Sequence, residues 1–189
     1  MAQHEKRIRS DARQNKKIIL ESTIELSLSG IDITELKMSD IAKHAGVGIG
    51  TLYRHFESKA RLCEAVMDTQ VESMFQEIEV FLEEHKNYHS YQRIFGILSH
   101  FLNLKEANFL ILSFIEKSSN SAGVVIHVPF YHSLAELIKS QLKEKDIENL
   151  DFKIDVMLNC FSSDFYYYSK HIQKLSKTEF LEQVLDIIL

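Results

Sequence analysis

The side chains best suited to chemistry are concentrated in one short stretch, GVGIGTLYRHFESK, from Gly46 to Lys59. It offers hydroxyl, phenol, guanidinium, imidazole and ammonium groups. Such groups donate hydrogen bonds to phosphate oxygens and to the edges of bases. Two glycines, Gly48 and Gly50, allow a helix backbone to come close to a large ligand. The stretch therefore predicts a surface that meets a nucleic acid.

Two short crossed helices are needed to present these groups, and residues 38–57 have the spacing of a helix-turn-helix. Ala42 supplies the small residue where the helices cross, Gly46 tolerates the positive φ of the turn, and Leu52 faces back towards Ala42. At about 100° per residue, the second helix then turns its other side outward. On that side Gly50, Thr51 and Arg54 point away from the core, Tyr53 and His55 lie on the flanks, and Ile49 lies between core and groove.

The run GVGIGTLYRHFESKARL resembles the TetR family of bacterial transcription regulators, whose typical pattern is small-Gly-Val-x-x-Gly-x-Leu-Tyr-x-His-Phe-x-x-Lys. The resemblance covers roughly residues 12–66, the length of a three-helix DNA-reading domain. It implies that Gly50 and Thr51 lie against the groove of DNA. It also implies that Tyr53, His55 and Lys59 contact phosphates. The residues expected to bind DNA are Ser39, Gly48, Ile49, Gly50, Thr51, Tyr53, Arg54, His55 and Lys59.

Three residues depart from the family pattern. Lys37 stands where a threonine usually caps the first helix of the motif, so the cap shifts to Ser39 or is weak. Gly48 replaces a common serine, and Ile49 stands where a polar or basic residue is frequent. An apolar Ile49 has two interpretations, contact with a thymine methyl group or half-buried packing. The sequence therefore does not predict which bases are read.

Charge is divided unevenly along the 189 residues. The net charge is −5, yet residues 1–64 hold 11 Lys and Arg against 9 Asp and Glu, whereas residues 65–189 hold 11 against 18. Six of the basic residues lie within the first 17 positions. A basic end on an acidic body orients a molecule on a polyanion. A merely solvated charged tail has the same composition, but beside a helix-turn-helix we expect this end to contact phosphates.

Composition favours a helical protein of the cell interior. One proline and six glycines leave few interruptions, which is typical of long helices. The chain has no run near the ~20 apolar residues of a membrane span and no apolar core of a signal peptide. We therefore expect a cytoplasmic protein with no membrane partner. Its two cysteines fall inside apolar patterns typical of reduced thiols.

No motif for catalysis, a metal or a cofactor is visible in the sequence. It has neither a glycine-rich phosphate loop nor a nucleophile elbow, and no carboxylate pair in a recognisable motif. His85 and His89 have a spacing that metal ligands use, but no third ligand is placed near them. We therefore expect no enzymatic activity, no metal and no cofactor.

Hydrophobic periodicity predicts an all-α fold of about nine helices. A helix-turn-helix DNA-binding domain of three helices occupies residues 1–58, and a long helix joins it to a C-terminal helical bundle. Residues 59–189 form this effector-binding and dimerisation domain. We expect Gly30 to end the first helix and Ser58 to cap the fourth. The predicted helices span 11–28, 39–45, 48–56, 59–85, 90–104, 106–117, 125–145, 151–171 and 177–189.

Aromatic side chains of the second domain predict a pocket for a small-molecule effector of unknown class. In a helical bundle such rings either line a pocket or form ordinary core, and the sequence leaves both interpretations open. The residues predicted to line the pocket are Phe101, Phe114, Phe130, Tyr131 and Tyr167.

The last two predicted helices are apolar over more than one packing face, and Ser176 with Glu179 forms a capping box before the final one. In the resembling family these helices pair with their copies in a second subunit, which implies a four-helix interface in a homodimer. The residues expected at this dimer interface are Met157, Phe161, Phe165, Leu181, Val184, Leu185 and Ile188.

Together these features predict a TetR-like transcription regulator, a repressor that binds a palindromic operator as a homodimer and leaves it when an effector binds. A dimer is expected because one recognition helix contacts too few base pairs, whereas two heads ~34 Å apart read a palindrome. The alternatives are a helical interaction protein whose first domain binds a protein partner, and a DNA-binding protein that has no effector.

Overall fold

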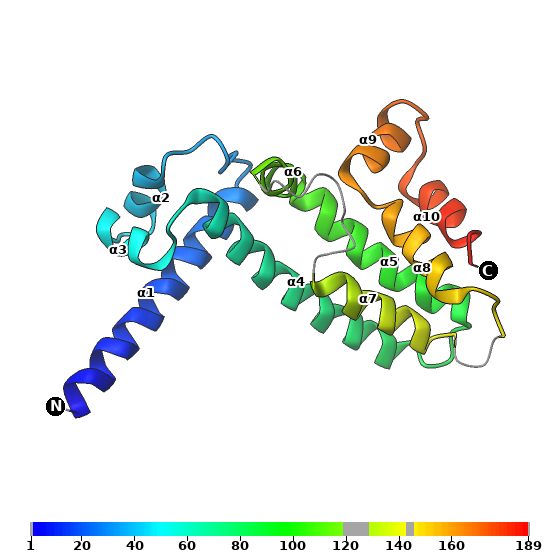
Figure 1. The fold of residues 1–189 in the computed structure, drawn as a ribbon, viewed down its shortest axis with the longest axis horizontal. Coiled ribbons are helices and arrows are strands. Elements are labelled where there is room, and N and C mark those ends of the chain that lie inside the picture. The colour runs from blue at the N-terminus through cyan, green and yellow to red at the C-terminus, as the bar shows by residue number, and fades with distance from the viewer. Residues whose placement is uncertain (1, 119–128, 143–145, 189) are drawn as a thin grey trace. The chain divides into compact units, whose positions relative to one another are not determined.

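A computed structural model describes residues 2–118, 129–142 and 146–188 of the chain. Those residues form ten α-helices and no strand, which confirms the predicted all-helical fold with one helix more than expected (Figure 1). The helices are α1 (Ala2–Leu28), α2 (Met38–His44), α3 (Ile49–His55), α4 (Lys59–Glu84), α5 (Ser90–Ala107), α6 (Phe109–Ser118), α7 (Pro129–Ser140), α8 (Leu150–Asn159), α9 (Ser163–His171) and α10 (Lys177–Leu185).

The chain folds into two compact units. The head comprises residues 1–70 and 110–118, and the body comprises residues 71–109 and 119–189. Helices α4 and α6 each begin in one unit and end in the other. The predicted boundary after residue 58 differs from this division, because it marks the end of the expected DNA-binding domain. It stays a prediction.

In the head, α1, α2 and α3 contact one another around a small apolar core. Leu52 of α3 is fully buried and Ala42 of α2 is nearly so, as expected where two helices cross closely. Helix α3 is therefore held by one side only. The buried side chains of the head core include Ile19, Thr23, Leu26, Ile33, Met38, Ile41, Ala42, Ala45, Leu52, Phe56, Leu62, Cys63, Val66 and Met67.

Helix α1 begins at Ala2, well before the predicted start at Asp11. The prediction followed apolar periodicity, but the preceding residues are mostly Gln, Glu, Lys and Arg, which have high helix propensity and need no apolar partner. Among the helix residues from Asp11 onward, Ile19 is the first that is buried. Figure 1 shows the N-terminal half of α1 running on past α2 and α3. The helix therefore begins well before Ile19, and its start follows helix propensity rather than apolar periodicity.

Two glycines end the first two helices in the same way. Gly30 has φ of +82° and Gly46 has φ of +65°, a region that favours glycine. After α2, the Gly46 N–H donates to the Lys43 carbonyl and the Val47 N–H donates to the Ala42 carbonyl, at 3.2 and 3.0 Å. This is a Schellman motif, and Gly30 makes the equivalent pair of bonds after α1. The predicted roles of both glycines are confirmed.

Helix α4 is capped by Ser58, as predicted. The Arg61 N–H donates to Ser58 Oγ at 3.2 Å, so the cap satisfies one of the free N–H groups of the first turn. Where α4 passes into the body, the ring of Phe81 lies directly on Gly96 of α5. A Cβ atom at Gly96 would lie 2.1 Å from Phe81 Cζ, so only glycine leaves room for this contact.

The core of the body is built around two aromatic rings, Phe101 of α5 and Phe161 beside α8. Their centroids are 5.1 Å apart, and neither side chain is exposed. The ring of Phe180 of α10 lies edge-on to the ring of Phe161, with centroids 5.4 Å apart, so the last helix packs against this core. The helix predicted over 125–145 is described from Pro129, whose missing N–H suits a helix start. The rest of that prediction lies partly outside the described residues.

A single helix predicted over 151–171 is wrong, because the chain breaks it into α8 and α9. The Cys160 N–H is shared between the Val156 and Met157 carbonyls, which tightens the last turn of α8. Ser162 then adopts φ −56° and ψ 147° and begins α9. Three successive polar residues, Ser162 to Asp164, favour such a helix start over continuation.

Helix α10 has the predicted capping box. Ser176 Oγ accepts from the Glu179 N–H at 3.2 Å, and the Ser176 N–H donates to Glu179 Oε2 at 2.8 Å. These bonds hold the pKa of the Glu179 carboxyl below its ordinary value. Across the part of the chain described here, no helix is both long enough and apolar enough to cross a membrane.

Candidate nucleic-acid interface

Helix α3 is fixed in the head by its two apolar residues. Leu52 is 0% exposed and Phe56, which ends the helix, is 4% exposed. The Phe56 N–H donates to the Leu52 carbonyl at 2.9 Å, so the two anchors are one turn apart. Gly48 precedes the helix in an extended conformation, and its carbonyl accepts from the N–H groups of Thr51 and Leu52. Helix α3 is therefore short and is anchored in the head by two buried side chains one turn apart.

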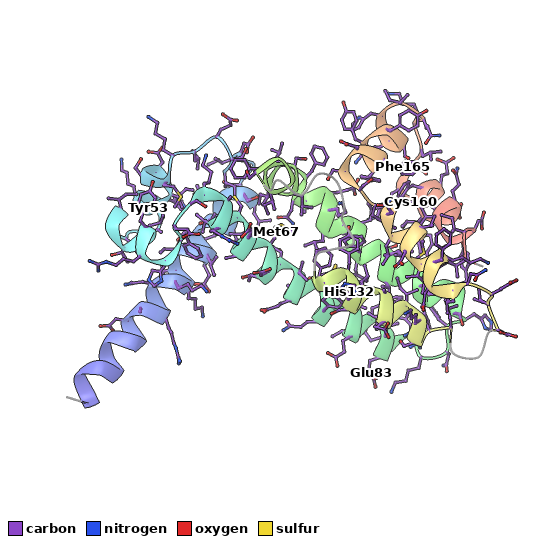
Figure 2. The ribbon with its side chains drawn as sticks, viewed as in Figure 1. Tyr53, Met67, Glu83, His132, Cys160 and Phe165 are labelled. Carbon is purple, nitrogen blue, oxygen red and sulfur yellow. The ribbon has the colours of Figure 1, made fainter. Side chains whose placement is uncertain are left out.

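The outer side of α3 carries the predicted DNA-binding residues. Tyr53, labelled in Figure 2, is 51% exposed and Ile49 is 43% exposed. Gly50 and Arg54 are exposed as well, whereas Thr51 and His55 are half-buried. No carboxylate lies between Gly48 and Phe56. All six residues therefore keep exposed surface on α3, and four of them, Thr51, Tyr53, Arg54 and His55, carry groups that can donate hydrogen bonds to a polyanion.

The start of α2 rules out a helix cap at Ser39, one of the two alternatives that the sequence left open. The helix cap does not shift to Ser39, because Lys37 is the N-cap residue and α2 begins at Met38. The Lys37 N–H donates to Asp40 Oδ2 at 3.3 Å, so an acidic residue in the first turn compensates for the missing threonine. Ser39 is left exposed in this first turn, with its hydroxyl free of the capping role.

Lys59 has an internal partner that the sequence did not reveal. Its ammonium group donates a hydrogen bond to the Thr34 carbonyl and lies 5.6 Å from the centroid of the Phe114 ring. Asp32 Oδ1 in turn accepts from the Thr34 N–H and Oγ1, at 2.9 and 2.6 Å. Lys59 therefore ties the start of α4 to the loop after α1. Its predicted phosphate contact stays a prediction and would use the other donors of the ammonium group.

Cys63 lies one turn further along α4 and is fully buried. Burial raises the pKa of its thiol to about 11, and the nearby ammonium group of Lys59 opposes this only in part. The thiol is therefore protonated at neutral pH and packs as a small apolar side chain.

Further basic residues surround α3. Lys43 and His44, which the helix-turn-helix pattern does not single out, are exposed in the last turn of α2, where the helix dipole favours positive charge. On α1, Arg13, Lys16 and Lys17 are exposed, and Lys16 Nζ lies 6.0 Å from the centroid of Phe56. Lys16 therefore places the positive charge of α1 beside the end of α3.

Three of the five residues predicted to line an effector pocket meet in the body. The ring of Phe101 lies 5.9 Å from Phe130 and 5.5 Å from Tyr131, and the last two are 4.6 Å apart. Phe101 and Tyr131 are buried, so they contact each other as core residues. Tyr167 instead is 51% exposed and stacks on Phe109, and Phe114 belongs to the head. Phe101, Phe130 and Tyr131 therefore lie together in the body, and the role of the five residues in ligand binding stays a prediction.

A solvent-open groove of about 460 Å³ lies elsewhere in the body, along α4 beside α5. Its lining follows one face of α4 at helical spacing, with His100 of α5 opposite, and His100 Nδ1 lies 3.4 Å from Glu77 Oε2. The periodicity of α4 is the signal that could have shown this face, but the sequence does not say that α5 leaves it uncovered. The lining residues are Ser73, Gln76, Glu77, Val80, Phe81, Glu84 and His100.

Most residues predicted at a dimer interface lie inside the chain's own core. Met157, Phe161, Leu181 and Leu185 are 0% exposed, and Val184 and Ile188 are at most 5% exposed. In the single chain these side chains are covered by its own residues, and their part in a dimer stays a prediction. Of the predicted set, only Phe165 is exposed, at 45%. Other large apolar side chains that α8 and α9 expose are Phe152, Val156, Tyr167 and Tyr168, and Ile172 follows α9.

Among the described residues, no three His, Cys, Asp or Glu side chains come together in a way that could hold a metal ion.

Known proteins share both the motif and the whole length of the chain. The sequence model of bacterial regulatory proteins of the tetR family matches residues 19–66. The HTH-type transcriptional regulator SAR0097 of Staphylococcus aureus (strain MRSA252) is 50% identical over 190 residues, with both chains fully covered. The HTH-type transcriptional regulator SAUSA300_2515 of Staphylococcus aureus (strain USA300) is 27% identical over 187 residues, 96% of each chain.

The fold has a solved counterpart. A protein from Shewanella sp. PV-4, described as a tetR family transcription regulator, superposes with a TM-score of 0.55 over 92% of this chain and 95% of that chain, at 20% identity. This likeness extends the agreement from the motif to the whole helical fold. The chain therefore belongs to the TetR family of bacterial helix-turn-helix transcription regulators.

Proposed function

We propose that this protein binds a palindromic operator as a homodimer, places α3 of each head in the major groove, represses transcription there and is released by a small molecule. The observation that carries the DNA-binding step is the division of α3 into a fully buried anchor, Leu52, and an outer side of exposed donors around Tyr53. A helix held in this way presents base-reading and phosphate-binding groups without cost to its own packing.

The position of the basic residues also supports a contact between α3 and DNA. Exposed basic residues of α1 and of the last turn of α2 belong to the same compact unit as α3. Phosphate attraction acts over about a Debye length, roughly 8–10 Å at moderate salt. Local charge near α3 therefore matters more for DNA affinity than the net charge of −5 of the chain. Each phosphate neutralised releases counterions, so binding should weaken steeply as salt rises.

Dimerisation is proposed because a single seven-residue recognition helix spans few base pairs. The body offers an apolar surface for it on α8 and α9, where Phe152 is 70% exposed and Val156 is 39% exposed. Ile172, directly after α9, is 63% exposed. Exposed apolar side chains gathered on neighbouring helices are typical of a surface that a second subunit covers. We therefore assign the subunit contact to these exposed residues rather than to the buried residues of α10.

Release by an effector rests on the groove along α4. The groove has a volume of about 460 Å³ and is open to solvent, so a ligand bound there would lie along α4 with one side uncovered. Helix α4 runs from the groove in the body into the head, where Ser58 caps its first turn. A ligand that prefers one orientation of this helix would shift the population of DNA-competent dimers by its differential affinity for the two states.

The DNA-binding step is tested with the double variant Thr51→Ala with Tyr53→Ala in the full-length protein. Fluorescence anisotropy is measured on duplex DNA from the region upstream of its own gene. Each lost hydrogen bond costs about 0.5–1.5 kcal/mol. Two per head in a dimer therefore predict at least about a 30-fold loss of affinity.

The matched control is Tyr91→Ala with Thr178→Ala, which removes the same two side-chain types from exposed positions of the body. It should bind DNA as the wild type does. If the wild type shows no salt-sensitive affinity for any duplex, the chain is a helical interaction protein instead.

Sedimentation of Phe152→Glu tests the dimer, and it should yield monomers.

A further inference from the structure

We propose that Ile49 reads the C5-methyl group of a thymine in each half of the operator. This inference rests on the proposed DNA-binding function and names the base that the start of α3 recognises. Ile49 is the first residue of α3 and is 43% exposed, so a large part of its side chain stays open to contact. It is the one large aliphatic side chain exposed on this helix as described.

The two residues next to Ile49 in the sequence have no side chains that could cover it. A Cβ atom at Gly50 would meet nothing within 4 Å, and one at Gly48 would meet only Thr51 Oγ1, at 3.9 Å. With glycine on both sides, no adjacent side chain shields Ile49 from an approaching surface. Tyr53 lies one turn further along, so Ile49 belongs to the same outer side as the exposed phenol.

The chemistry of the major groove selects the partner. Guanine, cytosine and adenine present hydrogen-bonding atoms and no methyl group there, whereas thymine adds a methyl group. An isoleucine placed over a hydrogen-bonding atom removes water from it and offers nothing in return. Placed over a methyl group, it buries apolar surface on both sides. The β-branched side chain also has few rotamers to lose on binding. Ile49 therefore favours thymine against the other three bases.

The size of the effect follows from one methyl group. Burying a methylene-sized group changes affinity about fourfold for each half-site, which corresponds to ~0.8 kcal/mol. In a symmetric operator with both half-sites changed, the loss is about 15-fold.

The experiment first selects a preferred operator from random duplexes with the full-length protein. Each thymine of that operator is then replaced in turn by deoxyuridine, which removes only the methyl group. Affinity is measured by anisotropy for the wild type and for Ile49→Ala. We expect one thymine per half-site at which uracil weakens the wild type about fourfold. At the same position uracil should leave the affinity of Ile49→Ala unchanged.

The matched control is Ile31→Ala, since Ile31 is also 43% exposed and also lies in the head. This control should keep the full sensitivity to uracil. Ile49→Val keeps part of the side chain and should retain part of the sensitivity, which supplies a readout should Ile49→Ala unfold.

The outcomes separate this inference from the function on which it rests. A wild type that binds the selected operator but is indifferent to uracil at every thymine overturns the role of Ile49 and leaves DNA binding intact. Equal uracil sensitivity in the wild type and in Ile49→Ala overturns it as well. A wild type that selects no duplex overturns both proposals at once.

Discussion

Two glycines of the helix-turn-helix should respond to alanine in opposite ways, because their backbones differ. Gly46 has φ of +65°, and a Cβ atom built there meets nothing within 4 Å. The cost of Gly46→Ala is therefore conformational rather than steric. Holding an L-residue in the left-handed region costs about 1–2 kcal/mol, so we expect the free energy of unfolding to fall by that amount.

Gly50 lies inside α3 in an ordinary helical conformation, and its Cβ position is also open. Alanine restricts the unfolded chain and suits a helix, so Gly50→Ala should raise the free energy of unfolding by about 0.4–1 kcal/mol. The new methyl group lies on the outer side of α3, however. Inserting a methyl group into a close contact costs about 1–3 kcal/mol, so with one such contact in each of two heads operator affinity should fall about 30-fold or more.

Both variants are measured by urea unfolding followed by far-ultraviolet circular dichroism and by anisotropy with operator DNA. Gly46→Ala should lose stability, whereas Gly50→Ala should gain stability and lose affinity. The reasoning is refuted if the two substitutions change stability in the same direction, or if Gly50→Ala binds the operator as tightly as the wild type does.

Three further predictions concern buried positions. Leu52→Ala should cost about 3–5 kcal/mol of stability because the side chain is 0% exposed, and urea unfolding that shows a loss under 1 kcal/mol would count against its anchoring role. Gly96→Ala should lower the free energy of unfolding by about 1–3 kcal/mol, because the new Cβ would lie 2.1 Å from Phe81 Cζ. Adding Phe81→Leu should relieve part of this loss, so strictly additive effects of the two substitutions in urea unfolding would contradict the clash. Cys63, with a thiol pKa of about 11, should react with a thiol reagent only after unfolding, whereas the partly exposed Cys160 should react first.

Features set by residues close together in the sequence were predictable. Gly30, Gly46, Ser58 and the Ser176 capping box each act within about one helical turn, so the residue types alone indicate where helices begin and end. The buried position of Leu52 follows from helical periodicity within a motif of known spacing. Family resemblance added the direction in which α3 faces, and the exposure of Tyr53 agrees with it.

Features set by contacts between distant segments were not predictable. The sequence shows that α10 is apolar on a broad face, but not that Leu181 and Leu185 of this face are buried within the chain's own body. In the same way, the partner of Lys59 is a backbone carbonyl 25 residues away, which no side-chain pattern announces. Aromatic composition predicted a pocket, yet the rings of Phe101 and Tyr131 pack on each other. Apolar periodicity identifies a buried side but cannot name what covers it.

Dimethyl sulfate protection of the selected operator tests the central claim most directly, because the reagent methylates guanine N7 in the major groove and adenine N3 in the minor groove. With α3 in the major groove of each half-site, the wild type should protect guanine N7 in two patches about one helical turn apart, ~34 Å or slightly more. The variant with Thr51→Ala and Tyr53→Ala should lose this protection at the same protein concentration. Protection of adenine N3 alone, or an unprotected operator at saturating wild-type protein, would contradict the placement of α3.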